Sequence, residues 1–252
     1  MNRLSTLKYI FLFQLLLVIH SAHSQQLILQ GKITYERKEN LHKQFEDFGN
    51  EWTETLLKKI PKYETDLFQL TFNANKTVYK LLKQDENTAA AMTWGKVAWN
   101  NSVACDLELQ SMLDEKDIYG NLYCVHDSLP PLEWKLTGEY REIAGFNCRR
   151  ATTIIRDSLY VIAFYTDEIP VSSGPEALTG LPGMILGAVV PRLNYTFFAT
   201  KVEGMMIPEK DLDFIPAKKA KKVTQLTLLA TMKEAMEDWG KYGRKIYWKA
   251  AF

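Results

Sequence analysis

The sequence predicts an α+β fold in which a curved, mostly antiparallel β-sheet is packed against about two helices, an arrangement that a half-barrel would fit. Three observations lead to this fold class. Many short segments alternate apolar and polar residues, the connections between them are too short for crossover helices, and helical spacing appears only near the two ends of the chain. With 252 residues and 46% hydrophobic composition, one well-packed domain is the simplest expectation.

The first residues have the features of a secretory leader. Two basic residues precede an apolar run over residues 9–19, and Ala22-His23-Ser24 forms a small-x-small cleavage site. The run is about half of the roughly 20 residues that a membrane-spanning helix needs. We therefore expect a signal peptide over residues 1–24 and a single domain over 25–252 without a transmembrane span. This domain would lie in the periplasm, at the outer membrane or outside the cell.

The charge of the chain argues against a nucleic-acid partner. Removal of the leader takes away two of the 31 basic residues and no acidic residue, so 29 bases face 30 acids and the formal charge is −1. The cluster Lys218-Lys219-Ala220-Lys221-Lys222 is the main exception. It is more typical of a solvated segment before a helix than of a phosphate-binding patch.

The first strand and the first helix follow from their spacing. Residues 26–35 predict a strand with five residues on one face: Leu27, Leu29, Gly31, Ile33 and Tyr35. The next apolar residues recur at intervals of three and four, which predicts an amphipathic helix ended by Pro61: Leu41, Phe45, Phe48, Trp52 and Leu56.

The middle of the chain is predicted to be a meander of short strands joined by hairpin turns. Asn, Asp and Gly clusters separate the alternating segments. The expected strands are 67–72, 77–82, 92–99, 102–109, 118–125, 133–136, 139–143, 146–155 and 159–166, with a last hairpin of 184–190 and 195–202.

The chain is expected to close with one helix. Thr224 is the expected N-cap, and Gly240 or Gly243 the expected end. Its apolar face is predicted to contain Leu226, Leu229, Met232, Met236 and Trp239.

Cysteine and histidine are scarce. Cys105, Cys124 and Cys148 permit one disulfide, for which Cys105 with Cys124 is the first pair to test, or else all three are free and buried. Behind the leader, the histidines are His42 and His126. This number is too small for the common histidine-rich zinc sites.

Residues 164–186 hold proline and glycine in a motif-like order. Ile169-Pro170 and Gly174-Pro175 force extended or turn geometry, and Gly180-Leu181-Pro182-Gly183 adds a second turn signal. The hexapeptide Gly180–Ile185 resembles the GLPGLI family of secreted Bacteroidota proteins, with Met184 in place of leucine.

Further blocks extend the resemblance over most of the chain behind the leader. They are residues 132–136, 143–151, 207–208 and 219–224. The resemblance implies secretion, a β-rich domain and company with TonB-dependent outer-membrane transport. It supplies no catalytic residues.

The segment that holds these prolines and glycines is called the signature segment. We expect it to be a rigid corner whose exposed side lines an apolar cleft. The function expected from this is a non-enzymatic accessory protein of the cell envelope that binds a peptide, a lipid or an envelope protein, without a cofactor. The candidate binding residues are Trp134, Phe164, Tyr165, Ile169, Pro170, Gly174, Pro175, Gly180, Leu181, Pro182 and Gly183.

The alternative is an envelope hydrolase or a redox or copper protein that uses Cys124 or Cys148. Cys124 and His126 would share one face of a strand, but no third group that could orient a catalytic pair is visible. Cys148, His126 and Met205 are soft ligands of the kind that Cu(I) selects. Packing of the methionines is the simpler interpretation, so we expect neither catalytic residues nor a metal.

Overall fold

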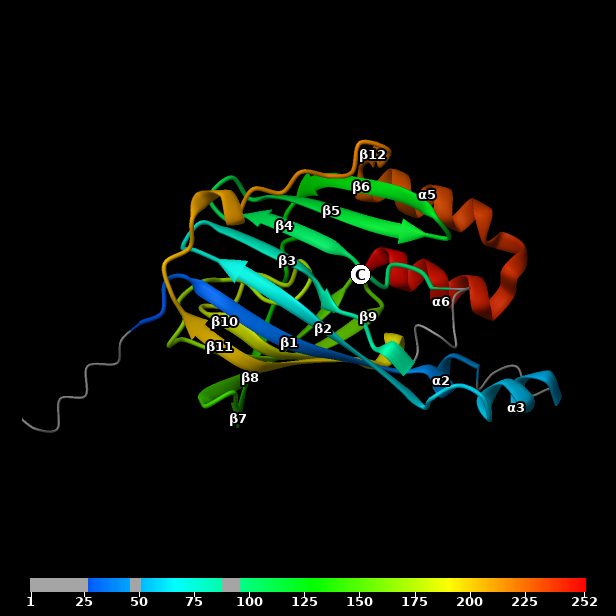
Figure 1. Ribbon diagram of the computed structural model, residues 1–252, viewed down its shortest axis with the longest axis horizontal. Coiled ribbons are helices and arrows are strands. Elements are labelled where there is room, and N and C mark those ends of the chain that lie inside the picture. Colours follow the sequence, from blue (N-terminus) through cyan, green and yellow to red (C-terminus); the bar gives the residue numbers. More distant parts are fainter. Residues whose placement is uncertain (1–26, 46–50, 88–95) are drawn as a thin grey trace, which may run out of the picture.

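A computed structural model of the protein describes residues 27–45, 51–87 and 96–252. The chain forms one strongly curved twelve-stranded sheet in the order β12-β6-β5-β4-β3-β2-β1-β11-β10-β9-β8-β7, with four α-helices in the described part (Figure 1). All neighbouring strands are antiparallel except β12 and β6. The expected fold class, a curved and mainly antiparallel α+β sheet, is therefore confirmed.

The elements have the following bounds. The strands are β1 (Gly31–Asn40), β2 (Tyr63–Phe72), β3 (Lys76–Lys83), β4 (Ser102–Asp106), β5 (Ser111–Ile118), β6 (Asn121–Ser128), β7 (Lys135–Ile143), β8 (Phe146–Ile155), β9 (Leu159–Thr166), β10 (Met184–Val190), β11 (Tyr195–Gly204) and β12 (Lys221–Val223). The helices are α2 (Leu41–Phe45), α3 (Glu51–Leu57), α5 (Gln225–Ala235) and α6 (Gly240–Ala251), with short 3-10 turns η1 (Pro191–Leu193), η2 (Glu209–Asp211) and η3 (Glu237–Trp239).

Strand β1 lies in the middle of the sheet and shows how the interior is built. It pairs with β2 on one side and β11 on the other, and every second residue is buried. Ile33 and Tyr35 fill the core, but Arg37 and Glu39 continue on the same face and are also buried. The strand period of two therefore carries charged side chains into the concave side of the sheet.

The signature segment, residues 167–183 between β9 and β10, packs inside this concave side. Ile169 and Val171 belong to the main core cluster, and the backbone N–H of Ile185 donates to the carbonyl of Ser173 at 2.8 Å. The hydroxyl of Ser173 bonds that of Thr77 on β3 at 3.3 Å. Since β3 and β10 stand four places apart in the sheet, this contact requires the sheet to curve around the segment.

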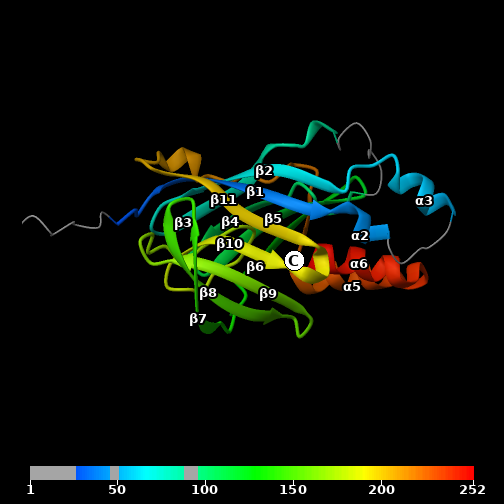
Figure 2. The ribbon, with the colours of Figure 1, turned by 90° about the horizontal axis from the view of Figure 1, so that it is seen from below.

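Helices α5 and α6 lie side by side at one end of the curve, as both ribbon views show (Figures 1 and 2). Thr224 caps α5, as expected, and its hydroxyl accepts from the N–H of Thr227 at 3.2 Å. The predicted apolar face was wrong in part, because Leu226 is 78% exposed and Trp239 46% exposed. The expected single helix also divides, since Gly240 begins α6 instead of ending α5.

Other boundaries differ for identifiable reasons. Strand β5 was missed because Asp114 and Lys116 take inward positions that usually hold apolar residues. The expected helix from Leu41 to Leu56 appears as α2 and α3, with residues 46–50 outside the described part. The first half of the expected strand 92–99 also lies outside it, and residues 96–99 contain only an isolated bridge between Val97 and Ile118.

The expected strands 133–136 and 139–143 are one strand, β7, whose pairing with β8 shifts register between Leu136 and Tyr140. The expected first strand begins later than predicted, at Gly31, and Leu27 and Leu29 are half exposed.

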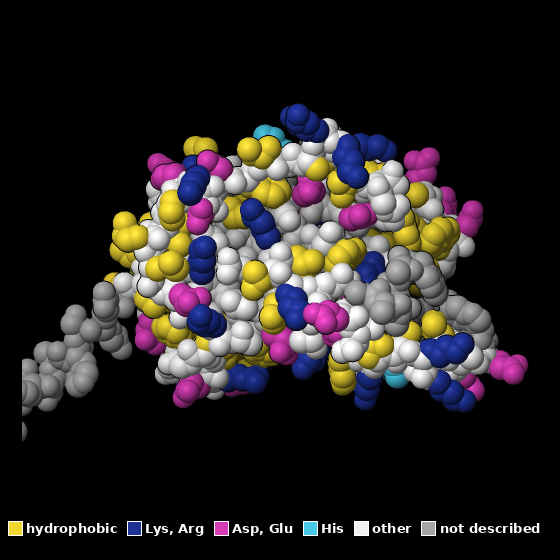
Figure 3. Space-filling model, in the orientation of Figure 1, with side chains coloured by type: hydrophobic (Ala, Val, Ile, Leu, Met, Phe, Trp, Pro, Cys, Tyr) yellow, Lys and Arg dark blue, Asp and Glu magenta, His cyan; other side chains and the backbone are white. Residues whose placement is uncertain are grey.

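The expected signal peptide, residues 1–24, lies outside the described residues. Among the helices that are described, none has the length and apolar character needed to cross a membrane. Acidic and basic side chains are interspersed over the face seen in Figure 3.

Candidate functional site

A cavity of about 310 Å³ lies where the two ends of the curved sheet approach each other. Its walls come from β5, the end of β6 with the β6–β7 connection, the end of β8 with the β8–β9 turn, the signature segment, the start of α5 and the end of α6. The volume falls at the lower end of the range for small-molecule sites. The lining residues are Met112, Asp114, Asp127, Ser128, Pro130, Pro131, Leu132, Ile154, Ile155, Arg156, Ala177, Leu178, Gln225, Ala251 and Phe252.

Local sequence features hold these walls in place. Pro130 and Pro131 keep the β6–β7 connection out of the sheet ladder. The β8–β9 hairpin turns through Arg156 and Asp157, whose φ angles of 51° and 57° are those of a type I′ turn. Gln225 at the start of α5 donates its backbone N–H to the Asp127 carboxylate at 3.1 Å, which joins the helix to β6.

Asp114 is a buried charged residue in the wall of the cavity. It is 3% exposed, and its Oδ2 atom lies 2.9 Å from the ammonium nitrogen of Lys116 on the same face of β5. The other carboxylate oxygen, Oδ1, has no hydrogen-bond partner among the residues that the structure describes. Burial raises the pKa of the Asp114 carboxyl, and Lys116 opposes that rise.

The structure places Asp114 within a larger group of buried charges, which we call the interior charge cluster. The side chains of its members are largely withdrawn from solvent. They come from β1, β2, β5, the signature segment and α6, and from Lys96, which lies outside these elements. They are Arg37, Glu39, Glu64, Asp66, Lys96, Asp114, Lys116, Glu176 and Lys249.

Four ion pairs use every base of the cluster. Arg37 pairs with Asp66 at 2.8 Å, Lys116 with Asp114 at 2.9 Å and Lys249 with Glu39 at 2.7 Å. The fourth pair joins Lys96 to Glu64. Such pairs offset much of the cost of desolvating each charge.

Glu176 is the acid of the cluster that has no ion pair with a base among the described residues. It is buried in the signature segment with a left-handed φ of 56°, and its Oε2 accepts from the amide of Asn101 at 3.1 Å. Burial raises the pKa of the Glu176 carboxyl, and the nearby Lys116 opposes that rise. A strained backbone that delivers an unpaired carboxyl to the interior is typical of a functional position.

Sequence reasoning missed this cluster, although a signal for it exists. Arg37 lies in phase with Ile33 and Tyr35, and Asp114 and Lys116 lie in phase with Met112 and Ile118. Charged residues at alternate positions that continue an apolar face indicate an interior polar group.

The predicted binding residues fall in several environments. The Trp134 indole N–H donates to the carbonyl of Thr179 at 2.8 Å, beside Gly180. Tyr165 and Leu181 are buried in the second core cluster, which Trp134 also contacts. Phe164 points to the other face of β9, where it contacts Phe198, with ring centroids 6.5 Å apart.

The remaining candidates divide by exposure. Ile169, Gly174, Pro175 and Gly183 are buried, whereas Pro170 and Pro182 are exposed. None of the predicted binding residues lines the cavity; Leu132, Ala177 and Leu178, which lie near them in the chain, do.

The three cysteines are free and buried. Cys105 on β4 and Cys124 on β6 have β5 between them, so two strand spacings of about 4.8 Å separate them and exceed the reach of a disulfide. The disulfide that was the first to test is therefore not formed, and the other alternative, free and buried thiols, is confirmed. Burial raises the pKa of Cys105 and Cys148 to about 12, and raises that of Cys124.

The proposed copper ligands are placed in different surroundings. Cys148 belongs to the main core cluster, His126 is exposed on β6, and Met205 is 48% exposed at the end of β11. The described residues contain no group of three or more His, Cys, Asp or Glu side chains that could hold a metal ion.

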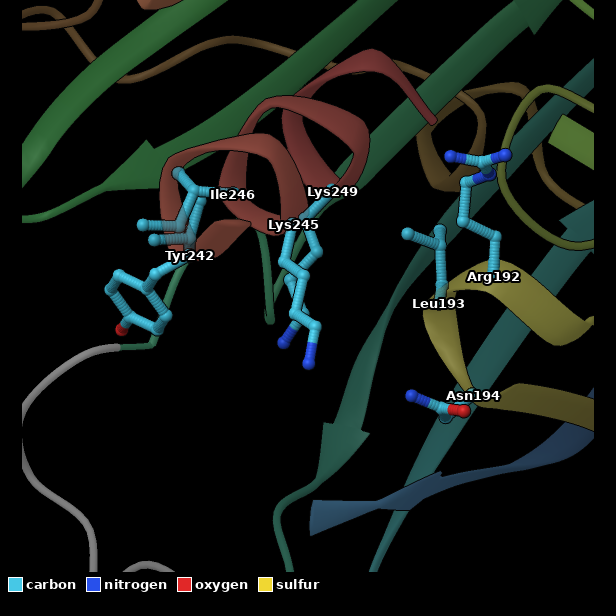
Figure 4. A pocket seen from close by; sticks show the side chains of 8 residues that line it. Arg192, Leu193, Asn194, Tyr242, Lys245, Ile246 and Lys249 are labelled. Carbon is cyan, nitrogen blue, oxygen red and sulfur yellow. The ribbon is translucent and has the colours of Figure 1, made fainter. Parts of the chain in front are cut away.

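A second and much smaller pocket, of about 20 Å³, lies between η1 and α6 (Figure 4). Lys245 and Lys249 extend from α6 into the same space, while Arg192 extends away from them. The ammonium group of Lys249 is bound to Glu39, and that of Lys245 donates to the carbonyl of Lys43 at 3.2 Å. These contacts and the small volume make this pocket a weaker candidate than the 310 Å³ cavity.

Comparisons with solved structures show similarity in fold at low sequence identity. A solved structure of PNGF-II in a P21 space group has a TM-score of 0.50 and 17% identity, covering 81% of this chain and 33% of the PNGF-II chain. A second PNGF-II structure, in a C2 space group, has a TM-score of 0.48 and 17% identity, covering 88% of this chain and 33% of that chain. The chain thus spans about a third of the PNGF-II chains that it matches.

An uncharacterised conserved protein from Thermus thermophilus has a TM-score of 0.38 and 10% identity, covering 80% of this chain and 93% of that chain. No curated protein matches the sequence.

Membership of this chain in the GLPGLI family stays a prediction. Residues 153–187, which contain the signature segment, match the model of a family described as a protein of unknown function, Porph_ging.

Proposed function

We propose that the protein is a non-enzymatic binding protein of the bacterial cell envelope that holds a small ligand in the 310 Å³ cavity. The observation that carries this proposal is the combination of a cavity of ligand size with a buried carboxylate oxygen on Asp114 that has no partner among the described residues. Apolar walls with a few placed polar groups are typical of small-molecule sites.

The signature segment supports the proposal because it forms part of the cavity wall. Ala177 and Leu178 line the cavity, and Glu176 beside them enters the interior charge cluster. The same segment lies within the family match at residues 153–187. A fixed order of proline and glycine would then serve to hold this wall against β3 and β10.

The chemistry of the cysteines favours binding over thiol catalysis. A thiol nucleophile needs a low pKa and access to solvent. Cys105, Cys124 and Cys148 are buried, and their pKa values are raised. His126 is exposed on β6, whereas Cys124, two residues before it, is buried.

Export and the partner are further parts of the proposal. The basic start, apolar run and small-x-small site of residues 1–24 support secretion. The resemblance to secreted Bacteroidota proteins supports an envelope partner, with a TonB-dependent outer-membrane system as the first to test.

Native mass spectrometry tests the proposal on protein purified from its own cell envelope. We expect the wild-type protein to retain a small molecule that the Leu178→Phe variant, with its cavity partly filled, does not retain. Circular dichroism and thermal unfolding would establish that the variant is folded. An equal load of the same molecule on both proteins, or none on the wild type, would contradict the proposal.

A further inference from the structure

We propose that the cavity binds a compact organic cation, whose ammonium group is held by the Asp114 carboxylate and whose apolar body contacts Leu178 and Ile155. This inference rests on the proposed function, because it names the chemical class of the ligand for the same cavity.

The first argument is charge balance. The interior charge cluster contains five acids and four bases among the described residues, so its formal charge is −1. Each base already has an acid within ion-pair distance, and Glu176 is left over. An unbalanced buried charge is costly. One proton or one bound cation restores neutrality, and the cavity gives a cation a route to the cluster at Asp114.

The second argument is the position of the free acceptor. Within the described part of the chain, Oδ1 of Asp114 has no hydrogen-bond partner, and Asp114 is the member of the cluster that lines the cavity. Lys116 lies within ion-pair distance of Oδ2, although its ammonium nitrogen makes no hydrogen bond among the described residues, and Oδ1 is left without a partner. A carboxylate that carries a charge accepts only hydrogen bonds, so the matching ligand group is a donor, and an ammonium group adds the missing positive charge.

The third argument is a contrast with the second acid of the cavity. Oδ1 of Asp127 accepts from the N–H of Ser128 at 2.9 Å, and Oδ2 accepts from the N–H of Gln225 at 3.1 Å. Both oxygens therefore have partners. The ligand's cationic group is assigned to Asp114 because its free oxygen is buried, whereas the oxygens of Asp127 are already used.

The rest of the lining sets the body of the ligand. Leu132, Ile155, Leu178 and Phe252 supply apolar lining, while Ser128, Arg156 and Gln225 are the other polar residues of the wall. A volume of about 310 Å³ holds a ligand with one ring or a short chain beside its ammonium group.

The test compares two probes of nearly equal shape by titration calorimetry on the purified protein. The probes are 2-phenylethylammonium and its neutral counterpart, 2-phenylethanol. We expect the wild type to bind the ammonium probe at least about tenfold more tightly. We expect Asp114→Asn to weaken ammonium binding by roughly tenfold to a hundredfold, since a hydrogen bond to a charged group is lost, while alcohol binding stays within about threefold.

Two further variants keep the test informative if Asp114→Asn does not fold. Glu176→Gln removes the uncompensated charge without changing the lining, and it should reduce the preference for the ammonium probe. Asp127→Asn is the matched control. It removes a charge from the same cavity, but the oxygens of Asp127 are already bonded, so the variant should leave the preference for the ammonium probe unchanged.

The outcomes separate the two proposals. Equal affinity of both probes for the wild type would overturn the cation assignment while ligand binding by the cavity stood. A loss of preference in Asp127→Asn as large as in Asp114→Asn would also overturn it. If neither probe binds the wild type at millimolar concentration, both the cation assignment and the proposed function are contradicted.

Discussion

Gly183 is the last glycine of the hexapeptide Gly180–Ile185. We predict that the fold requires glycine at this position, because the neighbouring backbone leaves no space for a Cβ atom. A Cβ atom built on Gly183 would lie 2.0 Å from the carbonyl oxygen of Thr166, and real Cβ atoms are not found closer than 3.0 Å to such an atom. Gly183→Ala therefore forces the two backbones apart by about 1 Å. Because Thr166 pairs with Met184 at the start of the β9–β10 ladder, the shift acts on a buried strand pair.

The expected cost follows from this displacement. Overpacking of a dense interior costs about 1–3 kcal/mol, and a clash with backbone belongs at the upper end of that range. A loss of about 3 kcal/mol is a large part of a stability of about 5–15 kcal/mol, and would lower the unfolding temperature of a chain of this size by roughly 6–12 °C.

Urea and thermal unfolding, followed by circular dichroism, would measure the effect. Gly138→Ala is the matched control, because a Cβ there has nothing within 4 Å and we expect a change below about 0.5 kcal/mol. Gly180 provides a second comparison, since its φ of 92° predicts strain of about 1–2 kcal/mol from conformation. A Gly183→Ala protein as stable as Gly138→Ala would refute the reasoning.

Three further predictions concern the buried charges and thiols. Because the folded chain holds the Glu176 proton more tightly than the unfolded chain, the free energy of unfolding should fall as pH rises from the ordinary glutamate pKa through the raised one. Glu176→Gln should flatten that fall, and urea titrations between pH 4 and about pH 8 that show equal slopes would contradict it. Arg37→Met should cost about 3–5 kcal/mol, since Asp66 would be left charged and buried, and adding Asp66→Asn should recover part of this loss in denaturant melts. The three cysteines should resist a thiol reagent in the native protein and react after denaturation, and rapid native labelling would show that a thiol is accessible.

The comparison of sequence with structure shows where local patterns are reliable. The hairpin of β8 and β9 was predicted with its boundaries because alternation and turn residues agree there. The N-cap at Thr224 was predicted for the same reason, since capping depends on residues within one turn. The curved antiparallel sheet followed from short connections, which are also local.

The candidate site could not be predicted in the same way. Its cavity brings together residues from Met112 to Phe252, which approach only because the sheet curves. Asp114 and Glu176 look like ordinary polar residues of a strand and a loop, and only burial makes their charges significant. The Trp134 contact with Thr179 likewise joins segments 45 residues apart.

The sequence by itself determined the type of most strands and helices, the antiparallel order of the hairpins and the turn-rich character of the signature segment. Each of these depends on the backbone preferences of neighbouring residues, or on alternation with a period of two. The tertiary structure decided the register of β5, the separation of Cys105 from Cys124 and the meeting of Asp114, Lys116 and Glu176. These depend on which strands become neighbours and on how far the sheet bends, since burial and charge pairing arise only after distant segments pack together.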